Sequence, residues 1–155
     1  MNLRRYSFGL TTLTFILLLI GVYTKEVGAD LTCGMRWPLC NGSFFGLFPA
    51  NFASFIEWFH RLIALVVGIM ILYFFYVTYK RLGSKNRVTK AVAVAVLLLP
   101  IQVILGALTV TKARLFSPET LRFIGAYISV AHYGIGVLLF TALVTATLWI
   151  REDVA

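Results

Sequence analysis

The chain has 155 residues, of which 60% are hydrophobic and only 13% are charged. A soluble domain contains about 25% charged residues, so this composition excludes an ordinary soluble fold and indicates a protein embedded in a lipid bilayer. The net charge of +8 does not indicate a nucleic-acid-binding protein, because so apolar a chain has no soluble face for a basic patch; we expect the basic residues to flank membrane-spanning segments.

Four apolar stretches follow one another along the chain, at about 7–24, 53–79, 91–111 and 123–150. Each is long enough to cross a bilayer as a helix, which takes roughly 20 residues. A helix satisfies its own backbone hydrogen bonds inside the membrane, where no water is available. The sequence therefore predicts an all-α membrane protein, a four-transmembrane-helix up-down-up-down bundle that forms a single domain over residues 1–155.

The first apolar stretch also resembles a secretory signal peptide. Arg4 and Arg5 precede it, and Val27-Gly28-Ala29 loosely fits a cleavage site. The apolar run is long for a signal peptide, so we expect this stretch to remain in the protein as its first span.

The distribution of Lys and Arg predicts how the bundle is oriented. Eight basic residues lie at one side and six at the other, and the dense cluster between Lys80 and Lys90 contributes most of the difference. Cytoplasmic loops are enriched in Lys and Arg. We therefore expect both termini on the cytoplasmic side of the plasma membrane, with the loops 25–52 and 112–122 on the outer side.

The only two histidines of the chain, His60 and His132, both lie inside predicted spans. At about 1.5 Å of rise per residue, they lie roughly 10–14 Å from the outer ends of two helices that run in the same direction. Imidazole is a common ligand of haem iron, so this depth-matched pair predicts a haem held by two axial histidines. The alternative is that each histidine forms a hydrogen bond between helices.

Glu57 precedes His60 by three residues, so both lie on one helix face, with the carboxylate about one turn nearer the outer surface. From there it could accept or deliver a proton near one edge of a bound porphyrin. A salt bridge with Arg61 or Arg122 explains this residue equally well.

Cys33 and Cys40 are the only cysteines, and both lie in the predicted outer loop 25–52. An outward-facing loop is an oxidising setting in which a disulfide persists, and two cysteines with no nearby histidine make a poor zinc site. We therefore expect a disulfide rather than free thiols. The spacing does not distinguish a structural disulfide from a redox-active pair.

Several motifs together resemble the haem A synthase family, and they cover essentially the whole chain in the order of that family. The motifs are Thr32-Cys33 and Trp37-Pro38-Leu39-Cys40 in the first loop, Glu57-Trp58-Phe59-His60-Arg61 in the second span, residues 102–110 (QVILGALTV) in the third, and Ala131-His132-Tyr133-Gly134 in the fourth.

The resemblance implies an enzyme that oxidises the C8 methyl group of haem O to the formyl group of haem A. It implies that His60 and His132 are the axial ligands of the substrate haem iron, and that Glu57 is essential to the oxidation. It also implies that the cysteine pair assists catalysis or electron transfer.

The enzymes of that family have eight spans in two homologous halves, each with its own histidine pair. This chain resembles the half that holds the substrate haem. We expect a homodimer, which would restore eight helices and four histidines. Haem O synthase or a terminal oxidase are further candidate partners that the resemblance suggests.

Two other functions compete with the synthase. The first is a b-type cytochrome that passes electrons, for example from quinol, through a haem b that it does not modify. The second is a non-catalytic assembly factor in which the histidines are packing residues and no haem binds. The cysteine loop and the Glu57 motif argue against the second more strongly than against the first.

Overall fold

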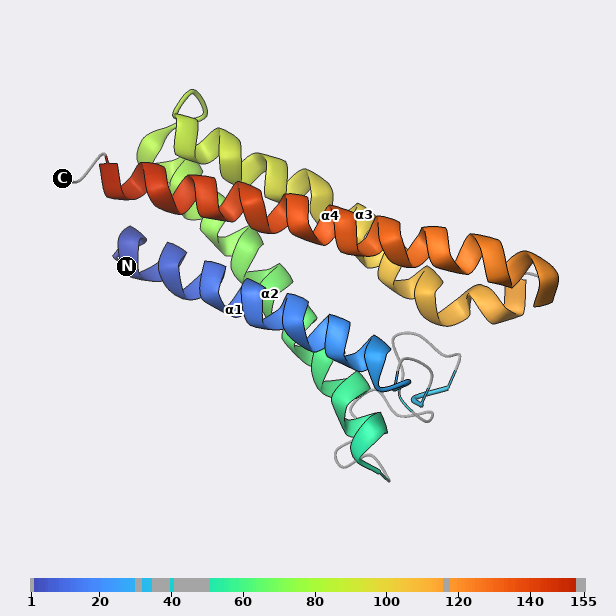
Figure 1. Cartoon of the computed structure of the whole chain (residues 1–155). Helices are drawn as coiled ribbons and strands as arrows, with labels where there is room; N and C mark the ends of the chain where they lie inside the picture. The colour runs from blue at the N-terminus through green and yellow to red at the C-terminus, as the bar shows by residue number, and fades with distance from the viewer. Residues whose placement is uncertain (1, 30–31, 35–39, 41–50, 116–117, 153–155) are drawn as a thin grey trace.

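A computed structural model of the chain describes residues 2–29, 32–34, 40, 51–115 and 118–152, without the side chains of residues 112–119 and 121–122. This part of the chain forms four α-helices (Figure 1), which are α1 (Leu3–Glu26), α2 (Phe52–Leu82), α3 (Arg87–Leu115) and α4 (Pro118–Glu152). Each is long and apolar enough to cross a membrane. The chain is a multi-pass, all-α membrane protein, and the predicted four-helix fold is confirmed.

The ends of the helices are set by short polar residues and by glycine. The side chains of Asn2, Asn51 and Asn86 each accept a hydrogen bond, at 2.8–3.2 Å, from a backbone N–H group in the first turn of the helix that follows. Such caps satisfy donors that have no partner inside the helix. α2 ends at Gly83, whose positive φ of 81° ends the helix without the steric cost that a side chain would bring.

The helices extend beyond the apolar stretches that predict them. α4 begins at Pro118, several residues before the apolar stretch that starts near residue 123. Proline is favoured in the first helical turn because the N–H group it lacks has no partner there. The polar residues after it can continue the helix outside the hydrocarbon, where apolar character no longer marks helical structure.

The four helices form a ring of neighbours. α1 packs against α2 and α4, α3 packs against α2 and α4, and in the described part of the chain no backbone contact joins α2 to α4. Both termini and the turn between α2 and α3 lie at the same end of the bundle (Figure 1). α2 and α4 therefore run in the same direction at diagonally opposite corners.

The buried core lies in the half of the bundle nearest the termini. The hydroxyl of Tyr6 donates to the carbonyl oxygen of Met70 at 3.0 Å, and the hydroxyls of Thr11 and Thr147 bond at 3.0 Å, which ties α1 to α2 and to α4. The core residues come from all four helices: Leu10, Val67, Ile71, Phe74, Val88, Ala91, Val92, Ala95, Leu139, Leu143, Ala146 and Ile150.

This core ends at the same level on the two diagonal helices. Its last members toward the far end of the bundle are Val67 on α2 and Leu139 on α4. His60 and His132 each lie seven residues, or two helical turns, beyond that last core residue. The two histidines are thus placed at matching distances from the core, in the half where α2 and α4 are not joined by core packing.

Candidate functional site

His60 on α2 packs against a glycine of α1. A Cβ atom added to Gly21 would lie 2.9 Å from the Cε1 atom of His60, so no larger residue fits there unless the ring moves. The Nδ1 atom of His60 is buried and has no hydrogen-bond partner. The predicted alternative of an interhelical hydrogen bond through this nitrogen is therefore not formed.

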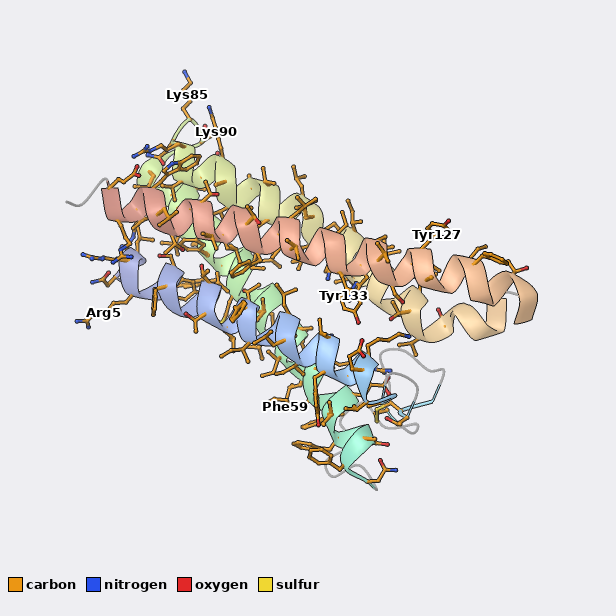
Figure 2. All side chains as sticks on the ribbon, in the orientation of Figure 1. Arg5, Phe59, Lys85, Lys90, Tyr127 and Tyr133 are labelled. Carbon is orange, nitrogen blue, oxygen red and sulfur yellow. A yellow bond between two sulfur atoms is a disulfide. The ribbon has the colours of Figure 1, made fainter. Side chains whose placement is uncertain are left out.

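His132 on α4 has the same kind of environment on the other side of the bundle. A Cβ atom added to Gly106 of α3 would lie 3.1 Å from the Cε1 atom of His132. Its Nδ1 atom is also buried without a partner, but the ring has a hydrogen bond with the backbone of Gln102 on α3, so the interhelical hydrogen bond predicted as the alternative is present for His132. The two histidines lie on α2 and α4 at matching distances from the core. Phe59 and Tyr133, which neighbour them in sequence, mark the two positions in Figure 2.

The contact between α3 and α4 repeats one pattern. His132 lies against Gly106, and one turn away Gln102 lies against Gly136, where an added Cβ atom would be 3.0 Å from the Gln102 Nε2 atom. On each of the two helices, a glycine therefore lies against a polar side chain of the other helix. The Oε1 atom of Gln102 is buried and unpaired. No role was assigned to Gln102 from the sequence. The signal for it is a polar residue four positions before a glycine on both helices, Gln102 before Gly106 and His132 before Gly136.

The two histidines are of a residue type that could hold a haem iron. Among the described residues, no three His, Cys, Asp or Glu side chains gather as they do around a protein-bound metal. A haem needs only one or two protein ligands, because the porphyrin supplies the other four nitrogens. A ligating imidazole normally donates its second N–H group to an acceptor. The buried Nδ1 atoms of His60 and His132 have no hydrogen-bond partner, and a bound group would satisfy such atoms.

Glu57 lies on α2 one turn before His60, and its side chain is almost completely buried. One carboxylate oxygen forms an ion pair with Arg61. The other accepts hydrogen bonds from the backbone N–H of Cys33 at 2.8 Å and from the hydroxyl of Thr32 at 3.2 Å. The salt bridge with Arg61 that was one of the two sequence-based explanations is formed, and the carboxylate also binds the cysteine-bearing turn.

Cys33 and Cys40 form a disulfide. The turn that carries Cys33 is held to the first turn of α2 because the hydroxyl of Ser54 donates to the carbonyl oxygen of Thr32 at 3.2 Å. The Cys33 sulfur also lies 3.5 Å from the carbonyl oxygen of Ser54. The disulfide, Glu57 and the start of α2 form one connected group. The motif residues Trp37, Pro38 and Leu39, and the side chain of Arg122, lie outside the part of the chain that the structure describes.

Comparison with known proteins gives relatives over most of the chain. It is 35% identical over 146 residues to haem A synthase of Bacillus licheniformis, covering 92% of this chain and 44% of that protein. It is 32% identical over 151 residues to haem A synthase of Bacillus pumilus, covering 97% of this chain and 45% of that protein. Protohaem IX farnesyltransferase of Haloarcula marismortui is 31% identical over 138 residues, covering 89% of this chain and 26% of that protein.

The chain spans less than half the length of these curated relatives. No solved structure matches it. The sequence profile of the cytochrome oxidase assembly proteins matches residues 45–155, which contain both histidines, Glu57 and three of the four helices. Because this match covers well over half of the chain, the chain belongs to the cytochrome oxidase assembly protein family.

Proposed function

We propose that the protein is a haem A synthase-like membrane oxidoreductase that binds haem O between His60 and His132 and oxidises its C8 methyl group to the formyl group of haem A. The observation that carries this proposal is the histidine pair. Both imidazoles lie two turns beyond the core on diagonal helices, both pack against glycine, and both have an unpaired buried nitrogen. The similarity to haem A synthases supports the choice of substrate.

We also propose the orientation that the basic residues predict. Both termini and the turn between α2 and α3 would face the cytoplasm, and the disulfide-bearing turn would lie on the outer side of the plasma membrane. The positive-inside bias supports this orientation. We further propose that residues 1–155 form a single domain.

In the proposed reaction, His60 and His132 bind the haem iron and fix the position of the porphyrin. Conversion of the methyl to a formyl group, with one oxygen atom taken from water, releases four protons and four electrons, so the proposed reaction also requires an external electron acceptor. The haem supplies the methyl group and an iron that can change its oxidation state. Glu57 lies one turn from His60 and accepts a proton released during the oxidation. A general base must first be close to the group from which it takes a proton, and sharing a helix face with a ligand provides that proximity.

Thr32 would regulate how readily Glu57 accepts that proton. Its hydroxyl lies 3.2 Å from the Glu57 carboxylate and 2.9 Å from the carbonyl oxygen of Ala29. The hydroxyl has a single proton, so it can donate to only one of these acceptors at a time. When it turns toward Ala29, a lone pair of Glu57 is free to receive a proton while Arg61 and the Cys33 N–H group still hold the carboxylate in place.

A second copy of the chain is the proposed partner, because a homodimer has eight helices and four histidines. The similarity to protohaem IX farnesyltransferases makes a haem O synthase a second candidate partner, as a source of the substrate. A terminal oxidase, which would receive haem A, is the third.

One observation favours the competing function, a b-type cytochrome that does not modify its haem. The contacts of Glu57 are also of a kind that serves a structural role, because the carboxylate is paired with Arg61 and anchors the cysteine-bearing turn. In that case the same two histidines would hold haem b and pass electrons.

The deciding experiment is extraction and mass analysis of the haem bound to protein made in cells that also make haem O. We expect haem O, hydroxylated haem O or haem A, with the oxidised forms lost in Glu57→Gln while haem O stays bound. Bound haem b alone would support the cytochrome. An absence of haem, or unchanged haem content in His60→Ala and His132→Ala, would contradict the proposed site.

A further inference from the structure

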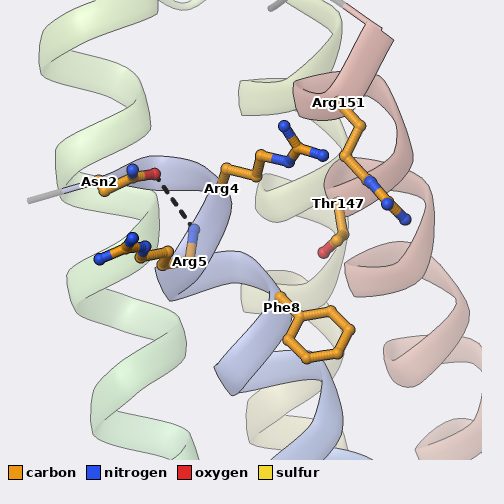
Figure 3. Close-up of a pocket in the computed structure, with 6 residues that line it drawn as sticks. All are labelled: Asn2, Arg4, Arg5, Phe8, Thr147 and Arg151. Atoms are coloured by element: carbon orange, nitrogen blue, oxygen red, sulfur yellow. Dashed lines mark hydrogen bonds between the residues drawn. The ribbon is translucent and has the colours of Figure 1, made fainter.

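A cavity of about 410 Å³ lies at the end of the bundle that carries both termini (Figure 3). It is formed where the start of α1 meets the end of α4, at the opposite end from the disulfide-bearing turn (Figure 1). Three of the six residues that line it are arginines. The six are Asn2, Arg4, Arg5, Phe8, Thr147 and Arg151.

No acidic side chain in the described part of the chain is paired with these three arginines. Glu152 follows Arg151 in sequence, but it pairs with Arg87 of α3 at 3.2 Å. A second ion pair joins Glu57 to Arg61 at the far end of the bundle. Like charges gathered without a counter-ion repel one another, so a bound anion would stabilise this end of the protein.

Besides the arginines, Asn2 is the lining residue that offers a hydrogen-bond donor to the cavity. The Oδ1 atom of Asn2 already accepts the backbone N–H of Arg5 at 3.2 Å, which leaves the amide NH₂ group of Asn2 to donate. The hydroxyl proton of Thr147 is used in a bond to the carbonyl oxygen of Leu143 at 2.9 Å. The start of α1 adds the positive end of a helix dipole. Guanidinium and amide donors together suit a ligand that has only acceptor oxygens, such as a phosphate group.

The cavity also has an apolar side and a fixed shape. The side chain of Phe8, one turn into α1 from Arg4, is 63% exposed. The hydrogen bond between Thr11 and Thr147 holds the two helices together just below the arginines. A ligand in this position would contact the arginines with its polar end and Phe8 with its apolar part. A lipid has both parts, whereas a soluble anion such as phosphate has only the first.

We propose that Arg4 and Arg151, whose side chains lie on the same side of α1 in Figure 3, bind in this cavity the phosphate of an anionic phospholipid from the leaflet at the terminal end of the bundle. Arginine suits this ligand because its planar fork can donate two parallel hydrogen bonds to a phosphate. Basic pockets between membrane helices are a known way to bind such headgroups. The inference does not depend on haem binding or on the reaction proposed above.

The test is native mass spectrometry of the full-length protein in detergent with added phosphatidylglycerol or phosphatidylcholine of the same acyl chains. The cavity variant is Arg4→Gln/Arg151→Gln. The control is Lys85→Gln/Lys90→Gln, which removes the same charge at the same end of the bundle but outside the cavity (Figure 2). Thermal unfolding without lipid shows that each variant is folded.

We expect the wild-type protein to prefer phosphatidylglycerol, the cavity variant to bind it about tenfold more weakly or worse, and the control to stay within about twofold. Equal binding of the two lipids would overturn the proposal, because the site would then not recognise an anionic headgroup. An equal loss in the control variant would overturn it in favour of diffuse surface charge. If millimolar inorganic phosphate displaces the lipid and stabilises the protein with the same dependence on Arg4 and Arg151, the cavity is a site for free phosphate and the lipid assignment is wrong.

Discussion

At the scale of single residues, the positions of the histidines depend on neighbouring glycines, which have no side chain. Gly21 and Gly106 allow the imidazoles of His60 and His132 to lie directly against the backbone of an adjacent helix. Glycine lowers helix stability by roughly 1 kcal/mol relative to alanine, so its use at both contacts indicates that the space for the ring is more important than the helix propensity. Small residues have the same purpose wherever membrane helices approach closely.

Enlarging those glycines should therefore displace the rings and weaken haem binding. Overpacking costs about 1–3 kcal/mol, so we expect Gly21→Leu and Gly106→Leu to lower haem affinity about tenfold, measured by titration of the haem absorption spectrum. The matched control is Gly134→Leu on α4, where an added Cβ atom meets nothing within 4 Å. A loss in the control as large as in Gly106→Leu would show that the effect is not local to His132.

The Thr32 hydroxyl gives a second prediction at this scale. Thr32→Val keeps the shape of the side chain and removes the hydroxyl, and a hydrogen bond to a charged group is worth about 1.5–3 kcal/mol. We expect the rate of haem O oxidation to change about tenfold or more while haem binding is unchanged, and Thr32→Ser to restore it. If Thr32→Val oxidises haem O at the wild-type rate, the hydroxyl has no part in positioning or protonating Glu57.

At the scale of the helices, the sequence could predict the elements better than their contacts. The four apolar stretches are visible because the bilayer requires length and hydrophobicity, and the only two histidines are visible because polar groups inside spans are rare. The bond from Cys33 to Glu57 joins residues 24 positions apart through a backbone N–H group, which has no signature in the side-chain pattern. The pairing of Gly106 with His132 depends on the register of α3 against α4, which periodicity alone does not fix.

The packing of α1 against α4 gives a prediction for this scale. The hydroxyls of Thr11 and Thr147 bond to each other at 3.0 Å inside the bundle. Removing such a bond costs about 0.5–1.5 kcal/mol, so Thr147→Val should lower stability by that amount in equilibrium unfolding in mixed detergent. Thr141→Val, on an exposed face of the same helix, is the control and should be nearly neutral. Equal stability of Thr147→Val and wild type would mean that this contact contributes nothing to the packing of α1.

At the scale of the whole molecule, the bundle has two dissimilar halves. The half near the termini contains the apolar core, and the half beyond Val67 and Leu139 contains the histidines, Glu57 and the disulfide-bearing turn. The residues that maintain the fold and those proposed to bind haem are therefore largely separate. A substitution in one half should affect the other only weakly, as expected for sites with no shared contacts.

The fold should consequently survive loss of the histidines. We expect His60→Ala/His132→Ala to bind no haem and yet keep the helical circular dichroism of the wild-type protein. Phe74→Ala, in the core, should lower stability by about 3–5 kcal/mol, measured by equilibrium unfolding of the haem-free protein. Extensive loss of helix in the double histidine variant would contradict this division.

The missing contact between α2 and α4 has a consequence for how a haem could reach its site. The two histidine-bearing helices face each other across the bundle, so an apolar molecule that parts two neighbouring helices from the membrane side would reach the space between the histidines. The bilayer could then be both the reservoir and the route for substrate and product. Capture would then be a search in two dimensions, and its rate should follow the number of substrate molecules per lipid instead of their concentration in water. Diluting the membranes in buffer would leave turnover unchanged, and diluting the substrate with added lipid would slow it.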